Sequence, residues 1–430
     1  MIEILPPTSP LDCTLSLPGS KYVANRVLPI AALAGGDSRL LGLPDNDDIT
    51  HTLAALQALG VRTTPGNLAP ELVVHGTGGR LTAPSHPIDV GASGTLMRFV
   101  TALCSLAEGS SVITGCERLR QRPVGSLCAA LRGLGVEVED SAGTPPVTVR
   151  GGKLPGGSTG VEGEVSSQFL SALLLISPLA QSSCAIELYG ALRSASYVDL
   201  TVATMAEFGV TVERSGQSHF LVAAPQVYTP RTYRIPTDWS SAGYFFAAAA
   251  ISGGTVTVTE LDLASTHGER GLLGVLASMG CALTQDNCRQ RVTVTGTSQL
   301  QPVRVSMTDM PDSLQTAAVV ASFARGPSRF CGVAHLRHKE SDRLGDTATE
   351  LRRLGVEVEV EDDALVVHGN PDRLHGATLE THGDHRMAMS LALFGLRVPG
   401  LCLSGEDCVA KSFPSYFETL ASIGVGLRHA

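Results

Sequence analysis

The sequence lacks a hydrophobic run long enough to cross a membrane. Its longest strongly apolar stretch, 169–180, falls short of the roughly 20 residues that a membrane-spanning helix needs. The opening segment MIEILPPTSP has no basic-then-apolar pattern of the kind that marks a signal peptide. From these two absences we expect a cytoplasmic protein that has no membrane partner.

The ten cysteines include no C-x-x-C pair, which argues against a zinc ribbon and against a thioredoxin-like redox motif. The P-loop pattern G-x-x-x-x-G-K-[ST] is also missing, and no G-x-G-x-x-G opens a βα unit. The histidine pairs 335/338 and 382/385 have no cysteine or carboxylate set nearby that would complete a metal site. We therefore expect no metal and no cofactor.

Lysine is scarce: of the 32 Lys and Arg residues only four are lysines, at positions 21, 153, 339 and 411. A chain that uses arginine elsewhere is expected to keep lysine where a compact ammonium or a shiftable pKa is needed. The formal net charge is −9, which makes a nucleic acid an improbable partner because phosphate backbones demand a basic surface. Any site for anionic substrates must therefore depend on a local positive field.

One short phrase recurs six times along the chain. An apolar helix end is followed by glycine and then by strand-like alternation, with the glycines at 60, 135, 209, 280, 355 and 424. Each glycine stands where a helix C-cap needs a left-handed residue. The intervals of 69 to 75 residues leave room for about two helices and three or four strands per unit. This pattern predicts an α/β protein of six units, three in each of two domains.

A chain of 430 residues is too long for one ordinary hydrophobic core, which also favours two domains. We expect the divide near 236–241, where a polar turn precedes a helix over 241–251. An N-terminal strand within 2–17 is expected to pair with the other domain. The predicted domains are therefore 1–20 with 238–430, and 21–237.

Several polar clusters stand directly before apolar helical runs, an arrangement that turns a helix N-terminus into an anion site. Each cluster taken singly is more typical of a simple helix cap. Four of them together, most with a lysine or arginine, favour anion binding. They are the segments 18–26, 91–98, 166–168 and 384–386.

The richest stretch is His335-Leu-Arg-His-Lys-Glu-Ser-Asp-Arg343. It is also compatible with a solvated helix start capped by Ser341. However, Lys339, Glu340 and Arg343 together offer an ammonium, a carboxylate and a guanidinium fork suited to binding a carboxylate. Glu340 beside Lys339 is a candidate proton donor or acceptor. Asp312 is either an N-cap or a general base.

These phrases resemble the 5-enolpyruvylshikimate-3-phosphate synthase family over essentially the whole chain. The most specific ones are Ser166-Ser-Gln-Phe169 and Lys339-Glu-Ser-Asp-Arg-Leu344. The others are Pro18-Gly-Ser-Lys21 with Arg26, Gly94-Thr95 with Arg98, Arg122-Pro123, Pro311-Asp312, Asp384-His-Arg-Met-Ala-Met389, and Lys411-x-Phe-Pro414. The resemblance implies a two-domain inside-out α/β barrel of six βαβαββ repeats, three per domain, with a cleft that closes on substrates.

The resemblance also implies which residues bind the substrates, phosphoenolpyruvate and shikimate 3-phosphate. The phosphate of phosphoenolpyruvate would be held by Lys21, Gly94, Arg122 and Gln168, and its carboxylate by Arg343, Arg386 and Lys411. Shikimate 3-phosphate would be bound by Tyr22, Arg26, Ser166, Ser167, Gln168, Ser194, Tyr197, Asp312, His335 and Lys339.

The implied chemistry is an addition followed by an elimination, which needs a base, an acid and cations. Asp312 and Lys339 are candidates at the shikimate 5-hydroxyl, and Glu340 is the candidate at the enol methylene. Lys21, His385 and Lys411 would assist the departing phosphate. The sequence does not assign the individual proton transfers among them. The resemblance further implies a monomer that is a target for glyphosate.

Three positions depart from the family's pattern: Tyr22 replaces a usual serine, and Ala92 and His335 each replace a common asparagine. Tyr22 and Ala92 bear on the identity of the acceptor. One rival is the related enzyme that acts on UDP-N-acetylglucosamine, which has a cysteine in a loop like that of Cys116. The spacing from Cys116 to Arg122 and the phrase at 166–169 disfavour it. The other rival is a catalytically silent paralogue that only binds a phosphorylated ligand.

Overall fold

The computed structural model describes residues 1–66 and 71–429. They form two compact units, each described here by itself. Unit 1 comprises Met1–Pro18 and Pro236–Ala430, and unit 2 comprises Gly19–Ile235. The chain passes between the units two residues before each of the two predicted boundaries. Each unit has its own hydrophobic core.

Unit 1 contains three four-stranded sheets, each of which joins one parallel pair to antiparallel neighbours. In sheet order, the first consists of β23 (Thr378–Glu380), β24 (Leu401–Ser404), β1 (Ile2–Leu5) and β25 (Gly426–His429). The second consists of β17 (Ala282–Asp286), β18 (Arg291–Thr295), β16 (Thr255–Val258) and β2 (Asp12–Leu15). The third consists of β19 (Arg304–Ser306), β20 (Gly326–Cys331), β22 (Ala364–Gly369) and β21 (Glu357–Val360).

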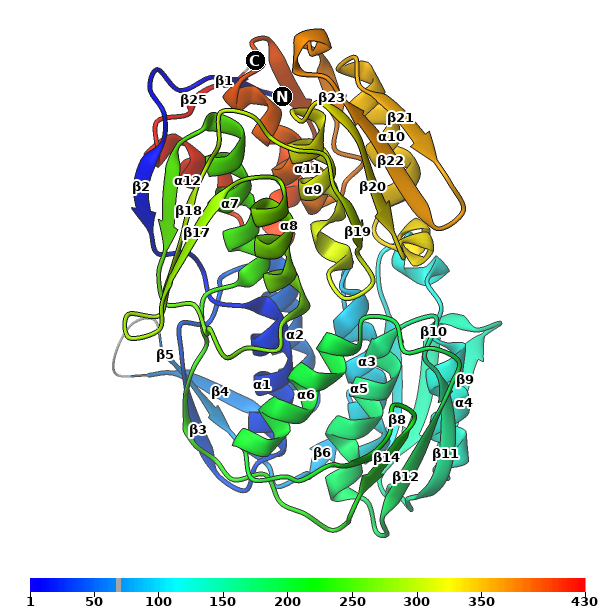
Figure 1. The fold of residues 1–430 in the computed structure, drawn as a ribbon. Helices are drawn as coiled ribbons and strands as arrows, with labels where there is room; N and C mark the ends of the chain where they lie inside the picture. Colours follow the sequence, from blue (N-terminus) through cyan, green and yellow to red (C-terminus); the bar gives the residue numbers. More distant parts are fainter. Residues whose placement is uncertain (67–70, 430) are drawn as a thin grey trace. The chain divides into compact units, whose positions relative to one another are not determined.

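Helices of unit 1 pack against these sheets (Figure 1). They are α7 (Trp239–Ser252), α8 (Leu272–Ser278), α9 (Leu314–Ser322), α10 (Arg343–Arg353), α11 (His385–Ala392) and α12 (Tyr416–Ser422). All residues of α9 and α11 are buried, as are all residues of α7 except the last. A helix that is buried on every side must be covered on every side, which explains their apolar sequences.

Unit 2 repeats this arrangement. One sheet consists of β6 (Leu81–Thr82), β8 (Ala107–Thr114), β10 (Thr144–Gly151) and β9 (Glu137–Ser141), with β7 (Ile88–Asp89) also paired to β8. Another consists of β11 (Gly157–Glu162), β12 (Cys184–Tyr189), β14 (His219–Val222) and β13 (Glu213–Ser215). The last consists of β15 (Thr232–Arg234), β3 (Asp37–Leu41), β5 (Glu71–His75) and β4 (Arg62–Pro65).

The helices of unit 2 are α1 (Lys21–Leu33), α2 (Asp47–Ala58), α3 (Gly94–Leu103), α4 (Gly125–Gly133), α5 (Ser167–Ile176) and α6 (Ala195–Glu207). Helices α3 and α5 pack on each other, as do α5 and α6. Both α3 and α5 are buried along nearly their whole length. Their N-terminal turns carry polar residues of the candidate site.

All six repeat glycines have a left-handed backbone, with φ between 84° and 101°. In each case the preceding helix ends and a strand or extended segment follows within a few residues. Residues with a Cβ rarely adopt this conformation, so glycine is the residue that lets each helix end there.

The N-terminal segment differs from the single strand expected within 2–17. It forms two strands, β1 and β2, in different sheets of unit 1. Strand β1 pairs with β24 and β25, and β2 pairs with β16. The residues between them include Pro6, Pro7 and Pro10, which cannot donate the hydrogen bonds of a continuous strand.

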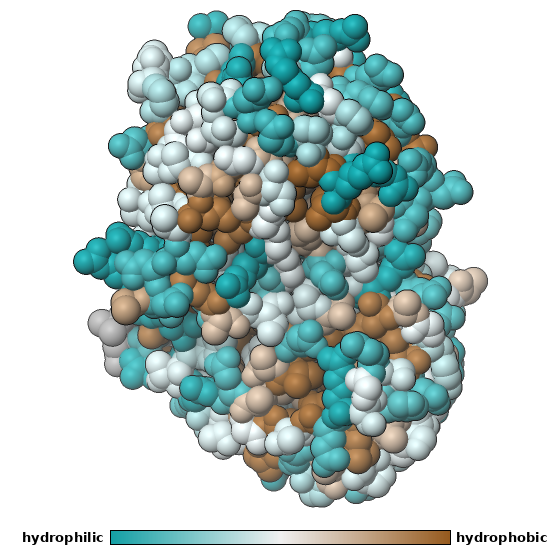
Figure 2. Space-filling view, viewed as in Figure 1, coloured by the Kyte–Doolittle hydropathy of each residue, from teal (hydrophilic) through white to brown (hydrophobic). Residues whose placement is uncertain are grey.

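The face drawn in Figure 2 is largely polar, with apolar side chains in small groups. The exposed large apolar residues are Met1, Val165, Tyr189, Leu221, Val227 and Val360. Within residues 1–66 and 71–429, no helix combines the length and apolar character needed to span a membrane.

Candidate active site

Four predicted site residues of unit 1 gather around the guanidinium of Arg343, whose side chain is 2% exposed: Asp312, Glu340, Arg386 and Lys411. Its Nε donates a hydrogen bond to Asp384 Oδ2 at 2.6 Å. Its Nη1 donates to Asp312 Oδ1 at 2.8 Å, and its Nη2 donates to Glu340 Oε2 at 2.8 Å. A planar guanidinium offers five donors in a fixed fork, so Arg343 can bind these three carboxylates at once in a defined arrangement.

The two proposed proton carriers of unit 1 are each held by two cations. Asp312 Oδ2 lies 3.1 Å from Arg386 Nη2, while its other oxygen binds Arg343. Glu340 Oε1 pairs with Lys411 Nζ, while its other oxygen binds Arg343. These ion pairs fix the orientation of both carboxylates. Each carboxylate side chain is 14% exposed, so some access from solvent remains.

The charges in this cluster balance. Arg343, Arg386 and Lys411 stand against Asp312, Glu340 and Asp384. Burial disfavours the charged form of Arg343, but the carboxylates of Asp384, Glu340 and Asp312 outweigh it and raise the pKa of Arg343 above its ordinary value. Arg343 therefore stays positively charged at any physiological pH.

Arg386 is placed by the start of helix α11. Asp384 caps this helix by accepting a hydrogen bond from the backbone N–H of Arg386 at 2.9 Å. The Arg386 side chain donates to Tyr244 Oη at 3.1 Å, and burial raises the pKa of Tyr244 to about 12. Tyr244 therefore remains a neutral hydrogen-bonding partner.

The remaining predicted residues of unit 1 lie close to this cluster in the sequence. His385 is the first residue of α11, is 1% exposed, and has its Nδ1 3.7 Å from Asp384 Oδ1. His335 lies in the 3-10 helix η6 (Ala334–His338), and half-buried Lys339 follows directly after it. The ion pairs of Glu340 described above join it to Arg343 and Lys411.

In unit 2, Gly94, Arg122 and Gln168 come together at the starts of helices α3 and α5. A Cβ on Gly94 would lie only 2.4 Å from Arg122 Nη1, so the guanidinium rests directly on the glycine. Gln168 Nε2 donates to Thr95 Oγ1 at 2.8 Å. Arg98 joins the two segments by donating to the carbonyls of Gly94 and Pro123, at 2.7 and 2.6 Å.

Lys21, Tyr22 and Arg26 lie on one end of helix α1. Lys21 Nζ pairs with Asp48 Oδ2 at 2.9 Å, and it lies 5.6 Å from the centroid of the Tyr22 ring. The Tyr22 ring packs on the Tyr197 ring, with centroids 5.2 Å apart and planes tilted by 31°. The aromatic pair therefore lies beside a lysine ammonium.

Arg26 is 1% exposed. Its Nε donates to Thr201 Oγ1 at 2.7 Å, and its two Nη atoms donate to the carbonyls of Tyr22 and Tyr197. Burial lowers the pKa of Arg26 to about 10, with Tyr197 and Tyr22 opposing the shift. The guanidinium is thus still charged at neutral pH and ties α1 to α6.

The predicted phosphate-binding serines lie at helix N-termini. Ser166 caps α5 by accepting a hydrogen bond from the N–H of Gln168 at 3.3 Å, and Ser167 is the first residue of that helix. Ser194 precedes α6 with a left-handed backbone, φ 56°. Helices α5 and α6 pack together, and Thr201 Oγ1 donates to Ser171 Oγ at 2.9 Å.

The structure places the helix starts earlier than the sequence indicated. Lys21, Gly94, Ser167 and His385 are first residues of their helices, whereas the sequence had placed them in polar segments before the helical runs. The first turn of a helix has free N–H groups and needs no apolar residues, so apolar periodicity underestimates its length. Similarly, Asp342 and not Ser341 caps α10.

Several residues around these groups were not assigned a role from sequence: Asp48, Glu269, Tyr244, Thr201 and Asp384. Asp384 belongs to the motif at 384–389, where the sequence indicated only a helix cap. An aspartate followed directly by His385 and Arg386 was the one signal available in the sequence. The others are brought in by tertiary contacts and have no local sequence mark.

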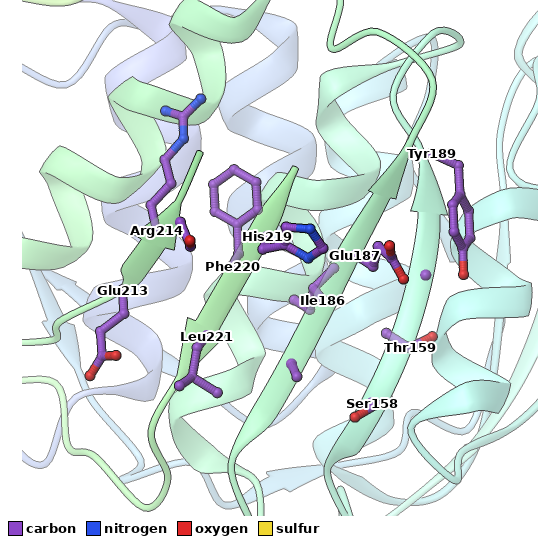
Figure 3. Close-up of a pocket in the computed structure, with 13 residues that line it drawn as sticks. Ser158, Thr159, Ile186, Glu187, Tyr189, Glu213, Arg214, His219, Phe220 and Leu221 are labelled. Atoms are coloured by element: carbon purple, nitrogen blue, oxygen red, sulfur yellow. The ribbon is translucent and has the colours of Figure 1, made fainter. Parts of the chain in front are cut away.

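A cavity of 570 Å³ lies elsewhere, on one face of the sheet formed by β11 to β14 (Figure 3). Tyr189, Glu187, His219 and Arg214 are among its lining residues, and none of the predicted site residues is. Two glutamates, Glu187 and Glu213, line it beside Arg214, so it lacks the excess of positive charge that an anionic substrate requires. No group of three or more metal-binding side chains occurs in residues 1–66 and 71–429.

Comparison with protein families matches residues 5–420 to "EPSP synthase (3-phosphoshikimate 1-carboxyvinyltransferase)". The chain belongs to this family. It is 40% identical over 410 residues to the 3-phosphoshikimate 1-carboxyvinyltransferase of Trichormus variabilis, covering 95% of both chains. It is 40% identical to that of Methanoculleus marisnigri, over 99% of this chain and 100% of the relative.

Among solved structures, the EPSP synthase of Acinetobacter baumannii matches with a TM-score of 0.84 and 28% identity, covering 100% of this chain and 99% of the other. The mixed α/β fold is therefore that of EPSP synthase structures. Membership of the family makes this chain an enolpyruvyl (carboxyvinyl) transferase. It favours the shikimate enzyme over the rival that acts on UDP-N-acetylglucosamine and over a silent paralogue.

Proposed function

We propose that the chain transfers the enolpyruvyl group of phosphoenolpyruvate to the 5-hydroxyl of shikimate 3-phosphate, with release of phosphate, through the residues gathered in each unit. The observation that carries this assignment is the cluster around Arg343, in which Asp312 and Glu340 are each bound by two cations. A reaction that develops and discharges negative charge needs both a proton carrier and a fixed cation beside it.

Arg343, Arg386 and Lys411 would bind the carboxylate of phosphoenolpyruvate. Before substrate arrives their charges are matched by Asp312, Glu340 and Asp384. An incoming carboxylate would compete with Asp312 and Glu340, and it would leave Asp384 in place because that side chain is fully buried. The two released carboxylates would then take part in proton transfer.

Lys21, Gly94, Arg122 and Gln168 would bind the phosphate of phosphoenolpyruvate. Support comes from the contact of Arg122 with Gly94 and from the N-terminus of α3, whose N–H groups attract anions. Lys21 and Lys411, with His385, would stabilise the phosphate as it leaves. Lys21 would exchange its pairing with Asp48 for the substrate.

Shikimate 3-phosphate would be bound by two sets of residues. Ser166, Ser167, Gln168 and Ser194 at the starts of α5 and α6 would hold its phosphate, with Tyr197 and Tyr22 against its ring and Arg26 toward its carboxylate. Asp312, His335 and Lys339 of unit 1 would lie near the reacting hydroxyl.

The addition needs two proton transfers, and the elimination needs one from carbon 3. In the addition, the 5-hydroxyl oxygen bonds to carbon 2 of the enol, loses its proton to Asp312 or Lys339, and carbon 3 gains a proton from Glu340. In the elimination, the bond from carbon 2 to the phosphate oxygen breaks and carbon 3 returns a proton, which restores the double bond. No cofactor takes part in this scheme.

At the level of the whole chain, we propose an inside-out α/β barrel of six βαβαββ repeats. Units 1 and 2 would be the two functional domains with three repeats each, as the three sheets of each unit suggest. We also propose a cytoplasmic monomer without a membrane or nucleic-acid partner. Light scattering on the purified protein can test whether it is a monomer.

The deciding experiment follows phosphate release with phosphoenolpyruvate and three acceptors: shikimate 3-phosphate, UDP-N-acetylglucosamine and plain shikimate. We expect turnover with shikimate 3-phosphate alone. Turnover only with the uridine nucleotide would transfer the assignment to the rival enzyme, and no turnover with any acceptor would support a binding protein.

A further inference from the structure

A second buried carboxylate lies directly behind Asp312 in unit 1. Glu269, in the 3-10 helix η4 (Gly268–Gly271), is 1% exposed. Its Oε1 accepts a hydrogen bond from the backbone N–H of Asp312 at 3.2 Å. Its Oε2 accepts a hydrogen bond from the Ser313 hydroxyl. Both oxygens of Glu269 are thus engaged by the segment that carries the proposed base.

That segment is the start of a helix. The 3-10 turn η5 (Pro311–Ser313) runs directly into α9, and Ser313 makes no side-chain capping bond of its own. The first N–H groups of a helix have no partner within it, and the helix dipole favours a negative charge at this end. Glu269 meets both needs from a different part of the chain, as an external cap.

Asp312 is consequently held from two sides. Its carboxylate is bound in front by Arg343 and Arg386, and its backbone is bound behind by Glu269. Arg386 Nη1 also lies 3.3 Å from the Asp312 carbonyl oxygen. If a substrate carboxylate takes over the two arginines, the hydrogen bond to Glu269 still holds the backbone of Asp312.

We propose that Glu269 is a positioning residue for Asp312, which it holds in place for proton transfer without touching the substrate. The inference rests on the role proposed above for Asp312. A negative charge behind Asp312 has a second effect, because a neighbouring like charge favours the protonated form of a carboxyl. Glu269 therefore makes Asp312 a stronger proton acceptor as well as a fixed one.

The test is a double-mutant cycle of Glu269→Gln with Asp312→Ala, with steady-state kinetics for both substrates. Glutamine keeps the size and one acceptor oxygen but removes the charge. We expect kcat to fall about tenfold or more, as misplacement of a reacting group predicts, with the KM for each substrate within about threefold. In the Asp312→Ala background, Glu269→Gln should lower kcat no further.

The pH profile supplies a readout that a purely structural role would not move. Removal of the charge lowers the proton affinity of Asp312, so the acidic limb of kcat should shift to lower pH in Glu269→Gln. A matched control is Glu71→Gln, which removes another buried carboxylate, paired with Arg39 in unit 2. Its kcat and pH profile should match those of the wild type.

An unchanged kcat in Glu269→Gln, or an equal fall in both backgrounds, would overturn the proposal. If Glu269→Gln fails to fold, Ser313→Ala replaces it in the same cycle, since it removes only the donor to Oε2. A fall that is confined to the background with Asp312 then supports the proposal, and an unchanged or additive effect rejects it. If the wild-type protein itself shows no turnover of phosphoenolpyruvate with shikimate 3-phosphate, the proposed function is rejected instead.

Discussion

Arg343 Nε donates a hydrogen bond of 2.6 Å to Asp384 Oδ2, and the two side chains are 2% and 0% exposed. The same aspartate caps α11 at the N–H of Arg386. One buried carboxylate thus orients both arginines that are proposed to bind the phosphoenolpyruvate carboxylate. We therefore expect both the stability of the protein and its affinity for phosphoenolpyruvate to depend on Asp384.

Asp384→Asn should therefore lower both properties. Removal of one partner of a buried pair destabilises a protein by about 3–5 kcal/mol, and we expect a loss near the low end of this range because Arg343 keeps Asp312 and Glu340 as partners. We expect a lower melting temperature and a KM for phosphoenolpyruvate raised about tenfold or more. Calorimetry and steady-state kinetics measure the two effects. Asp372→Asn, which breaks the exposed pair with Arg325, is the matched control and should change neither.

Asp312→Ala and Glu340→Ala should each reduce kcat by about 100-fold or more, the range for a positioned acid or base. Because Arg343 keeps two of its three carboxylates in either variant, the cluster should still fold and bind substrate. Titration calorimetry with shikimate 3-phosphate checks binding. Near-normal turnover in one variant would remove that residue from the mechanism. Glu361→Ala, which breaks an exposed surface pair with Arg329, is the control and should keep the wild-type kcat.

Gly94→Ala should weaken the binding of glyphosate more than the binding of phosphoenolpyruvate. We expect glyphosate, an anionic analogue, to compete with phosphoenolpyruvate. A Cβ at position 94 would lie 2.4 Å from Arg122 Nη1, the end of a flexible side chain, so the guanidinium can move and the fold should persist. The methyl group should raise the glyphosate inhibition constant about tenfold or more, and the KM for phosphoenolpyruvate less.

Gly274→Ala is the control for this series, since an added Cβ there meets nothing within 4 Å. Its inhibition constant and KM should equal those of the wild type. Equal losses for inhibitor and substrate in Gly94→Ala would contradict the assignment of Gly94.

Tyr22→Phe should leave the KM for shikimate 3-phosphate within about threefold of the wild-type value, because the ring and its contact with Tyr197 remain. Tyr22→Ala removes that contact, and an aromatic pair contributes about 0.5–1.5 kcal/mol, so this KM should rise roughly two- to tenfold. The KM for phosphoenolpyruvate should change little in both variants. A large effect of Tyr22→Phe would mean that the hydroxyl itself binds the acceptor.

The site could be predicted in part from local sequence. Residues such as Arg122, Arg343 and Lys411 stand in phrases with a recognisable order and spacing. Their immediate partners could not be predicted, because Asp48, Glu269 and Tyr244 come from distant segments and carry no local pattern. Tyr22 shows the same limit, since its ring contacts Tyr197, which lies on another helix and far along the chain.

The sequence by itself determined the α/β class, the six repeats of about 72 residues, the family resemblance and most of the charged residues of interest. These depend on periodicity, on left-handed glycines and on residue identity, all of which are local properties. Only the tertiary structure decided that Arg343 binds three carboxylates, that Asp384 orients two arginines and that Glu269 caps the Asp312 segment. Buried charges must find partners wherever the fold brings them, and that choice is made by packing and not by position along the chain.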